Sequence, residues 1–248
     1  MRLAPPFHLA GDHIAAELPG AHALFTTRRG GVSTGPFASL NLGLWTDDEP
    51  ANVHENRDRL AALTAIERGR FAQGRQVHGV GVRALDAPPD PDEEPAPADG
   101  QATSVDGVAP VVLVADCLPI ALAAPGAAAM LHAGWRGLAG GVVEAGVRAV
   151  RELGASGDVV AAIGPGAGGC CYEVGEEVHA AFAAHGDAVR RGRNLDLKAI
   201  AARELKAAGV SAVHDVGICT MCADPKLFYS HRRDGGVTGR QAGVAWRA

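Results

Sequence analysis

Several features that would place a protein in a special class are missing from this chain of 248 residues. Its N-terminal stretch has no apolar run that could serve as a signal peptide, and no later stretch is long and uncharged enough to span a bilayer. Its 33 glycines follow no Gly-X-Y period, which excludes a collagen-like chain. The formal net charge of −5 lacks the basic excess of a nucleic-acid-binding protein. We therefore expect a cytoplasmic protein that binds neither membranes nor nucleic acid.

The composition is that of an ordinary globular protein, with 47% hydrophobic and 21% charged residues. The length allows one large domain or two small ones. Residues 86–100 are acidic, rich in proline and nearly free of large apolar side chains, so we expect an exposed loop there. We interpret this loop as an excursion within one domain that spans residues 1–248; a domain boundary at the loop is the alternative.

Apolar runs and turn signals alternate along the chain and predict both strands and helices. The continuous apolar runs, such as residues 111–115 and 127–131, are typical of strands buried on both faces. The order of elements indicates a mixed α/β (α+β) fold. Strands are predicted at 76–85, 111–115, 127–131, 158–163 and 212–216, and helices at 47–63, 138–153, 174–184 and 197–208.

Three possible metal ligands, His78, Cys117 and His132, each lie where a predicted strand meets a loop. Such positions can converge at one edge of a sheet. Two imidazoles and a thiolate suit a first-row metal, zinc above all, and three protein ligands leave a fourth position open, as in catalytic sites. The sequence equally allows partly buried histidines with ordinary partners and a buried, unreactive Cys117.

Cys117 and His132 also allow a reaction without a metal, because a thiol and an imidazole can form a nucleophile–base pair. Asp116, the neighbour of Cys117, could orient an imidazole or act as a general acid. Cys219-Thr220-Met221-Cys222 has the spacing of half a zinc site or of a redox pair, and the sequence has no second such motif. Cys170 and Cys171 could complete a four-cysteine site in space, or all four thiols could simply be packed.

The segment 230–240 is dense in arginine and glycine, a composition that suits phosphate or another oxyanion. A solvated basic turn is the alternative. Arg57 and Arg136 lie beside predicted loops and could hold phosphate, and Asn41 could bind a ribose hydroxyl or a base edge. No Walker A motif and no dinucleotide-binding glycine fingerprint are present in the sequence.

Several of these stretches together resemble one family, known as multicopper polyphenol oxidase or laccase-like, purine nucleoside phosphorylase, and peptidoglycan editing factor. Three carry most of the resemblance: Gln76-Val77-His78-Gly79, Ala115-Asp116-Cys117-Leu118-Pro119 and His132-Ala133-Gly134-Trp135-Arg136-Gly137. The others are residues 25–33, 39–43, 55–57, 163–165, 171–174 and 232–240. The resemblance covers nearly the whole chain.

The resemblance implies a single domain of layered β-sheets flanked by helices, and a zinc ion held by His78, Cys117 and His132. It implies phosphorolysis of adenosine, inosine and methylthioadenosine, together with adenosine deamination. We predict Cys117, His132 and Asp116 as catalytic residues, and Asn41, Arg57 and Arg136 as residues that bind nucleoside and phosphate. In deamination, zinc lowers the pKa of a bound water toward about 7.

Two alternative activities remain open, beside a non-catalytic one in which the chain is a metal-dependent binding or partner protein and another enzyme does the editing. The spacing of Cys117 and His132 resembles the cysteine–histidine pair of the cytotoxic necrotizing factor deamidases, which would make the chain a cysteine hydrolase or amidase in peptidoglycan precursor editing. The laccase label implies Cu²⁺ and phenol oxidation, for which ten histidines provide few ligands. The chain also departs from the family pattern, because Leu44-Trp45-Thr46 stands where His-Val-Gly follows the Asn-Leu-Gly motif. We expect this departure to alter the pocket mouth.

Overall fold

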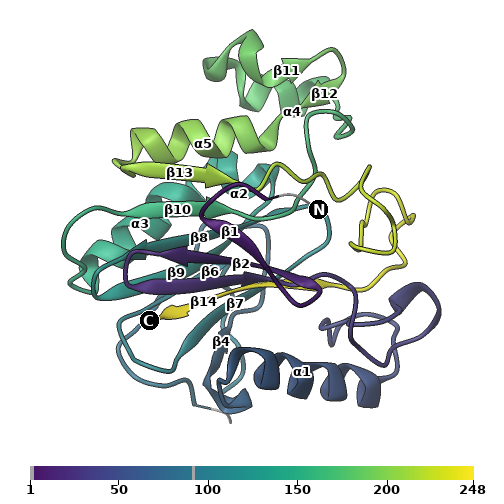
Figure 1. Cartoon of the computed structure of the whole chain (residues 1–248). Coiled ribbons are helices and arrows are strands. Elements are labelled where there is room, and N and C mark those ends of the chain that lie inside the picture. Colours follow the sequence, from purple (N-terminus) through teal and green to yellow (C-terminus); the bar gives the residue numbers. More distant parts are fainter. Residues whose placement is uncertain (1–2, 91–92) are drawn as a thin grey trace.

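The computed structural model describes residues 3–90 and 93–248, and its elements are stacked in layers (Figure 1). Two six-stranded mixed sheets of the described residues face one another at the centre, and helices cover their outer faces. This arrangement confirms the predicted mixed α/β class. It also explains the continuous apolar runs, because central strands of packed sheets are covered on both faces.

The first sheet has the strand order β1-β2-β3-β14-β7-β4 and includes both ends of the described chain. β14 pairs antiparallel with β3 on one side and with β7 on the other, so the last strand occupies an interior position. This pairing brings the basic segment before β14 to the end of β7. The strands are β1 (Phe7–Ala10), β2 (His13–Leu18), β3 (Ala21–Phe25), β4 (Phe71–Gln73), β7 (Ala109–Val114) and β14 (Gln241–Arg247).

The second sheet has the strand order β13-β10-β8-β9-β6-β5. Its centre is the antiparallel hairpin of β8 and β9, in which Pro119 is opposite His132. This register puts the start of β8 and the end of β9 at the same edge of the sheet. The strands are β5 (Val82–Leu85), β6 (Gly100–Thr103), β8 (Leu118–Ala124), β9 (Ala127–Ala133), β10 (Val160–Ile163) and β13 (Ala212–Asp215).

Small side chains fill much of the space between the two sheets. Val112 and Val114 of β7 pack with Met130 of β9 and with alanines of both hairpin strands. Gly243 of β14 approaches so closely that a Cβ there would lie 2.7 Å from the Pro119 Cβ and 2.9 Å from the Met130 sulfur. The two sheets can therefore pack tightly where they carry the central hairpin.

Helices pack on both outer faces (Figure 1). α3 and α5 cover the second sheet, and Val143 and Val150 of α3 are fully buried against it. α1 lies on the side of the first sheet, where Leu60 joins the cluster of Val111 and Val244. The helices are α1 (Pro50–Thr64), α2 (Trp135–Gly140), α3 (Val142–Glu152), α4 (Glu176–Ala181) and α5 (Leu197–Ala207). The 3-10 turns are Gly35–Phe37, Arg68–Arg70, Ala183–His185 and Asp187–Val189, and a small hairpin joins β11 (Arg190–Arg191) to β12 (Asn194–Leu195).

One predicted strand is largely wrong. Within the range 76–85 only β5 (Val82–Leu85) is a strand, and Val77 and Val80 are exposed rather than buried. The physical reason is that the backbone N–H groups of Val77, His78 and Gly79 donate to the Asp99 carboxylate instead of to a neighbouring strand. His78 adopts a positive φ of 58° in this turn, which a strand does not allow.

The segment 86–100 divides into two parts. Residues 86–90 and 93–97 are exposed, apart from half-buried Pro89, whereas Ala98, Asp99 and Gly100 are buried. The remaining two positions of the predicted loop, 91–92, lie outside the described residues.

Strand β8 was not predicted from the sequence, because Asp116 and Pro119 interrupt the apolar pattern there. Among the described residues, no helix is long and apolar enough to cross a membrane.

Candidate functional site

The structure brings His78, Cys117 and His132 together, with their ligand atoms within 4.8 Å of one another. His78 comes from the turn between β4 and β5, Cys117 from the junction of β7 and β8, and His132 from the end of β9. Gly134 gives them room, because a Cβ at that position would lie 3.0 Å from the Cys117 sulfur and 3.2 Å from the His78 ring. The three side chains form a group that could bind a metal ion.

Asp99, which immediately precedes β6, supports two of these three side chains. Its fully buried carboxylate accepts hydrogen bonds from the N–H groups of the 77–79 turn at 2.7–3.1 Å. The same carboxylate lies 2.8 Å from Nδ1 of His132. This contact leaves Nε2 of His132 to face Cys117, an arrangement typical of histidines that bind metals.

The charges of this group are strongly coupled. Burial raises the pKa of the Cys117 thiol, but the neighbouring His132 and His78 together outweigh burial and lower that pKa to about 6. Burial lowers the pKa of His132, but Cys117 and Asp99 outweigh it and raise that pKa to about 9. Near neutral pH and without a metal, the two groups therefore form a thiolate–imidazolium pair. The thiolate is the form that binds metals and acts as a nucleophile.

A cavity of about 440 Å³ opens above the three side chains, a size within the usual range for small-molecule sites. Aromatic side chains of Trp45, Trp135 and Tyr172 form part of its wall. Its cationic side chains are Arg136, Arg232 and Arg240, with His231 beside them. The segment 230–240 thus contributes to the same cavity as His78, Cys117 and His132.

Each of these arginines is held by the protein. The Arg232 guanidinium lies 5.1 Å from the Tyr172 ring centroid, and its Nη1 donates to the Glu173 carbonyl. Nη1 of Arg240 donates to the carbonyls of Thr238 and Gly239. Arg136 stacks over Trp135 at 4.3 Å. These contacts fix cationic groups along the cavity wall. None of the three arginines forms an ion pair with a carboxylate of the described residues, so their charge is available to an anion.

Two residues predicted to bind substrate lie behind the cavity wall and do not line the cavity. The Asn41 side chain is fully buried. Its amide N–H₂ donates hydrogen bonds to Thr46 and Asp48, and its Oδ1 accepts hydrogen bonds from the backbone N–H groups of Gly43 and Arg240. Arg57 donates to the Leu42 carbonyl and to Gln73 and lines a neighbouring cavity of about 340 Å³. Neither residue is among those that line the cavity above Cys117.

Asp116 lines the cavity, but its carboxylate is occupied by the protein. It accepts hydrogen bonds from the hydroxyls of Thr220 and Ser230, at 2.7 and 3.0 Å, and from the Arg232 N–H at 2.8 Å. Its backbone φ is +91°, a conformation that costs energy for a residue with a Cβ. Asp116 therefore joins the C-terminal segment to the strand end that carries Cys117.

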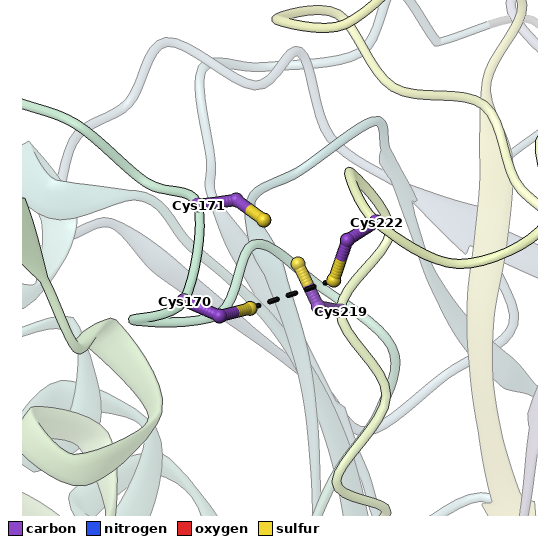
Figure 2. Close-up of side chains that lie close together, drawn as sticks. All are labelled: Cys170, Cys171, Cys219 and Cys222. Carbon is purple, nitrogen blue, oxygen red and sulfur yellow. Dashed lines mark hydrogen bonds between the residues drawn. The ribbon is translucent and has the colours of Figure 1, made fainter.

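The structure also brings together Cys170, Cys171, Cys219 and Cys222, whose sulfurs lie within 4.8 Å of one another (Figure 2). This four-cysteine group could bind a metal ion as well. The sequence showed Cys170-Cys171 and the Cys219–Cys222 motif as two separate pairs. Cys219 lies 48 positions after Cys171, so only the fold could bring the pairs together.

Asp99 and Tyr172 are the main cavity-related residues that sequence reasoning missed. Asp99 stands at the end of an acidic segment, where one carboxylate looks like the others. Its one distinguishing signal is that Gly100 and the apolar residue Ala102 follow it, as expected at the start of a buried strand. Tyr172 follows two cysteines, and nothing local indicates that its ring reaches the cavity.

Comparisons with known proteins agree over nearly the whole chain. A family model described as multi-copper polyphenol oxidoreductase laccase matches residues 22–248. A purine nucleoside phosphorylase of Streptomyces coelicolor is 42% identical over 236 residues, which cover 92% of this chain and 96% of the relative. A purine nucleoside phosphorylase of Deinococcus radiodurans is 43% identical over 238 residues, covering 93% and 90%.

Solved structures share the fold. The crystal structure of a hypothetical protein YfiH from Bacillus licheniformis superposes with a TM-score of 0.90 at 28% identity, covering 99% of this chain and all of that chain. YlmD from Geobacillus stearothermophilus superposes with a TM-score of 0.86 at 36% identity, covering 98% of both chains.

Proposed function

The chain belongs to the multi-copper polyphenol oxidoreductase laccase family, and from this membership we propose that it is a zinc-dependent purine nucleoside phosphorylase. The proposed substrates are adenosine, inosine and methylthioadenosine together with phosphate, and the products are the free base and (methylthio)ribose 1-phosphate. Adenosine deamination is proposed as a further activity. Relatives named purine nucleoside phosphorylase at 42–43% identity support the first activity.

One observation carries the proposal. A single cavity has the His78, Cys117 and His132 group at one side and guanidinium groups from Arg136, Arg232 and Arg240 around it. A nucleoside needs an aromatic wall and polar contacts, and phosphate needs fixed cations. This cavity offers both within about 440 Å³.

The donor set fits a transition-metal ion. Cys117 has a pKa lowered to about 6, so its sulfur is ionised at neutral pH, and Asp99 orients the His132 ring as carboxylates do beside metal-binding histidines. Two imidazoles and one thiolate favour zinc, with Cu²⁺ as the alternative that the family name suggests. Bound there, the ion would supply a Lewis acid beside the substrate.

The residues of the chain then have distinct tasks. Phosphorolysis forms a bond between a phosphate oxygen and C1′ of the sugar and breaks the bond from C1′ to the purine, which takes up a proton. Arg232 and Arg240 bind phosphate and hold it near the sugar, which lowers the entropic part of the barrier. Burial raises the pKa of Tyr172 to about 12, so its phenol keeps its proton and acts as a hydrogen-bond donor to the nucleoside.

Asp116 has a different task in this proposal. A carboxylate that accepts three hydrogen bonds from Thr220, Ser230 and Arg232 is suited to hold segments together. We assign it the positioning of Cys117 and of the Arg232 backbone. Asp116→Asn separates this task from a proton-transfer role, since a positioning residue changes KM for phosphate and a general acid changes kcat of deamination and its pH profile.

The deciding experiment uses the purified full-length chain with each nucleoside, with and without phosphate, before and after treatment with a chelator. We expect phosphate-dependent release of the base and of ribose 1-phosphate, lost on chelation and restored by zinc. Conversion of adenosine to inosine and ammonia without phosphate measures deamination separately. Zinc-loaded protein that releases no base from any of the three nucleosides would overturn the proposal.

A matched pair of variants tests the phosphate-binding part. Arg240→Ala removes a cation from the cavity and should raise KM for phosphate more than tenfold. Arg148→Ala is the control, because this arginine is exposed on α3 and pairs only loosely with Glu152. Equal KM values for the two variants would contradict the assignment of Arg240.

A cysteine hydrolase is the second candidate, and the chain Cys117–His132–Asp99 favours it. The His132 ring lies between a thiolate and a buried carboxylate, which is the arrangement of nucleophile, base and orienting group in cysteine hydrolases. An amidase of this kind would work with a free Cys117. Irreversible inactivation by iodoacetamide of metal-free protein that still cleaves an amide substrate would favour it over the phosphorylase.

A further inference from the structure

A second group of sulfur atoms lies outside the cavity, where two loops meet. One loop, 168–172, follows β10 and carries Cys170 and Cys171; the other follows β13 and carries Cys219 and Cys222. In Figure 2 the four thiols point toward one common centre. The Cys170 and Cys222 sulfurs are 3.5 Å apart, and all four lie within 4.8 Å of one another.

The backbone holds these loops in place independently of the thiols. Gly166 pairs with Cys219 in a parallel bridge, in which the Thr220 N–H donates to the Gly166 carbonyl at 3.1 Å. The Ala223 N–H donates to the Cys219 carbonyl at 3.0 Å, which closes a turn around Cys219 and Cys222. Gly168 has no room for a side chain, because a Cβ would lie 3.2 Å from the Cys170 sulfur and 3.1 Å from the Cys219 Cβ.

Backbone N–H groups are directed at one of the sulfurs. The Gly168 N–H donates to Cys219 Sγ at 3.2 Å, and the N–H groups of Met221 and Cys222 also face this sulfur. Several donors around one sulfur favour the thiolate over the neutral thiol. A cation bound among the four sulfurs would favour ionisation of the remaining thiols.

We propose that Cys170, Cys171, Cys219 and Cys222 bind one zinc ion in a tetrahedral, structural site. Zinc lies about 2.3 Å from each sulfur in such sites, which puts the sulfurs about 3.8 Å apart. The observed separations need only a small contraction to reach that geometry. Four protein ligands leave no position for a substrate, so this site serves the fold.

The proposed site would join two segments that reach the nucleoside cavity. Tyr172, next to Cys171, lines the cavity wall. Thr220, between Cys219 and Cys222, is fully buried and donates its hydroxyl to Asp116 at 2.7 Å. An ion bound to the four sulfurs therefore fixes both segments relative to one another. The site is tested by measuring metal content, so the result does not depend on whether the chain catalyses the proposed nucleoside reaction.

The experiment counts metal in the full chain expressed with zinc. The His78→Ala/Cys117→Ala variant leaves one imidazole at the cavity and an intact four-cysteine group, so we expect about one zinc per chain, against about two in the unaltered protein. Adding Cys219→Ser and Cys222→Ser to this variant should leave none. Circular dichroism and thermal unfolding check that each variant is folded.

Cobalt substitution provides a spectroscopic readout of the ligands. Co²⁺ bound to thiolates gives sulfur-to-metal charge-transfer bands whose intensity grows with the number of thiolates. We expect these bands in the His78→Ala/Cys117→Ala protein and a clear loss of intensity when Cys170→Ser, an exposed and conservative change, is added. The proposal is overturned if the His78→Ala/Cys117→Ala protein holds no metal, if iron occupies the cluster in place of zinc, or if intact mass shows Cys170 and Cys222 joined as a disulfide.

Discussion

The two sulfur-containing groups of this molecule differ in how their negative charge is balanced. In the cavity, the Cys117 thiolate faces the His132 imidazolium, and buried Asp99 supports that ring. In the four-cysteine group, backbone N–H groups and the Cys222 thiol approach Cys219. Near neutral pH and without a metal, the first group is an ion pair, whereas Cys170, Cys171 and Cys222 of the second keep their protons because their pKa values are raised. The comparison shows why similar ligands suit a reactive site in one place and a structural site in another.

The number of ligands separates the two groups further. His78, Cys117 and His132 leave a side open to a cavity of about 440 Å³, while four thiols would enclose an ion completely. Three ligands and an open position are typical of catalytic metal sites, and four sulfur ligands are typical of structural ones. Four measurements test whether the two groups differ in this way.

The largest contrast is in thiol reactivity. In chelator-treated protein, His132 and His78 together lower the pKa of Cys117 to about 6 against the effect of burial. Burial and neighbouring thiols raise the pKa values of Cys170 and Cys171 to about 11. Alkylation by iodoacetamide needs the thiolate. Cys117 should therefore react with a midpoint near pH 6, and its reaction should stop as pH falls below that value. Cys170 should react only in strongly alkaline solution.

Mass spectrometry of peptides after alkylation at a series of pH values measures these midpoints. Zinc-loaded protein is the control, because bound metal protects both groups. The same midpoint for Cys117 and Cys170 would remove the electrostatic difference on which the comparison depends.

Cys117→Ala removes one cavity ligand and the thiolate. Loss of the hydrogen-bond partner of a metal ligand typically costs about 10–100-fold in activity. Loss of the ligand itself should cost more, so we expect nucleoside turnover to fall more than about 100-fold. Cys222→Ser, which changes the other group, should keep most of the turnover at saturating substrate. Steady-state kinetics on both variants decides this; similar losses in the two proteins would mean that the groups do not have separate tasks.

Asp99→Asn tests the support behind the cavity ligands. An amide keeps the size but introduces an N–H₂ group among the backbone donors of the 77–79 turn, and it weakens the contact with His132. We expect a loss of about 10–100-fold in zinc affinity or activity. Asp106→Asn is the matched control, because Asp106 is exposed and pairs with Arg247. Unchanged zinc affinity in Asp99→Asn would show that the ligands need no carboxylate behind them.

Thr220→Val measures how strongly the two groups are coupled. The change removes the hydroxyl that donates to Asp116 and leaves a buried acceptor without this partner, at a cost of about 1–3 kcal/mol in stability. Denaturant unfolding should detect that loss, and KM for phosphate should rise a few-fold. Thr220→Ser keeps the hydroxyl and should lose less. If the Thr220→Val and Thr220→Ser variants have the same free energy of unfolding, the Thr220–Asp116 hydrogen bond does not couple the four-cysteine group to the cavity.

Much of the fold followed from local patterns. The helix predicted at 47–63 is observed as α1 (Pro50–Thr64), and the apolar run 127–131 lies within β9 (Ala127–Ala133). The turn at His78 was predicted as a strand, because its alternating valines satisfy the strand pattern while its hydrogen bonds go to Asp99. The partner of that turn is about 20 residues away, and local sequence does not contain this information.

The candidate site was predictable to a similar extent. Residue chemistry singled out His78, Cys117 and His132, and the structure brings their ligand atoms together. Their roles as metal ligands stay a prediction. Asn41 and Arg57 were selected by residue type and loop position, but their side chains bond to residues of the cavity wall, such as Thr46 and Gln73, and do not themselves line the cavity. Residue type reveals hydrogen-bonding capacity and does not reveal which partner uses it.

Apolar periodicity and ligand chemistry are local properties, so the sequence indicated most of the buried segments and the side chains that can bind metal or phosphate. Which of these side chains share a site depends on strand and loop pairing, which only the folded structure shows. The β8–β9 hairpin and the interior position of β14 bring residues 78, 117, 132 and 240 to one cavity, and the pairing of two loops joins Cys170 and Cys171 to Cys219 and Cys222. Composition and net charge could not locate either site, because strand pairing depends on contacts between distant residues.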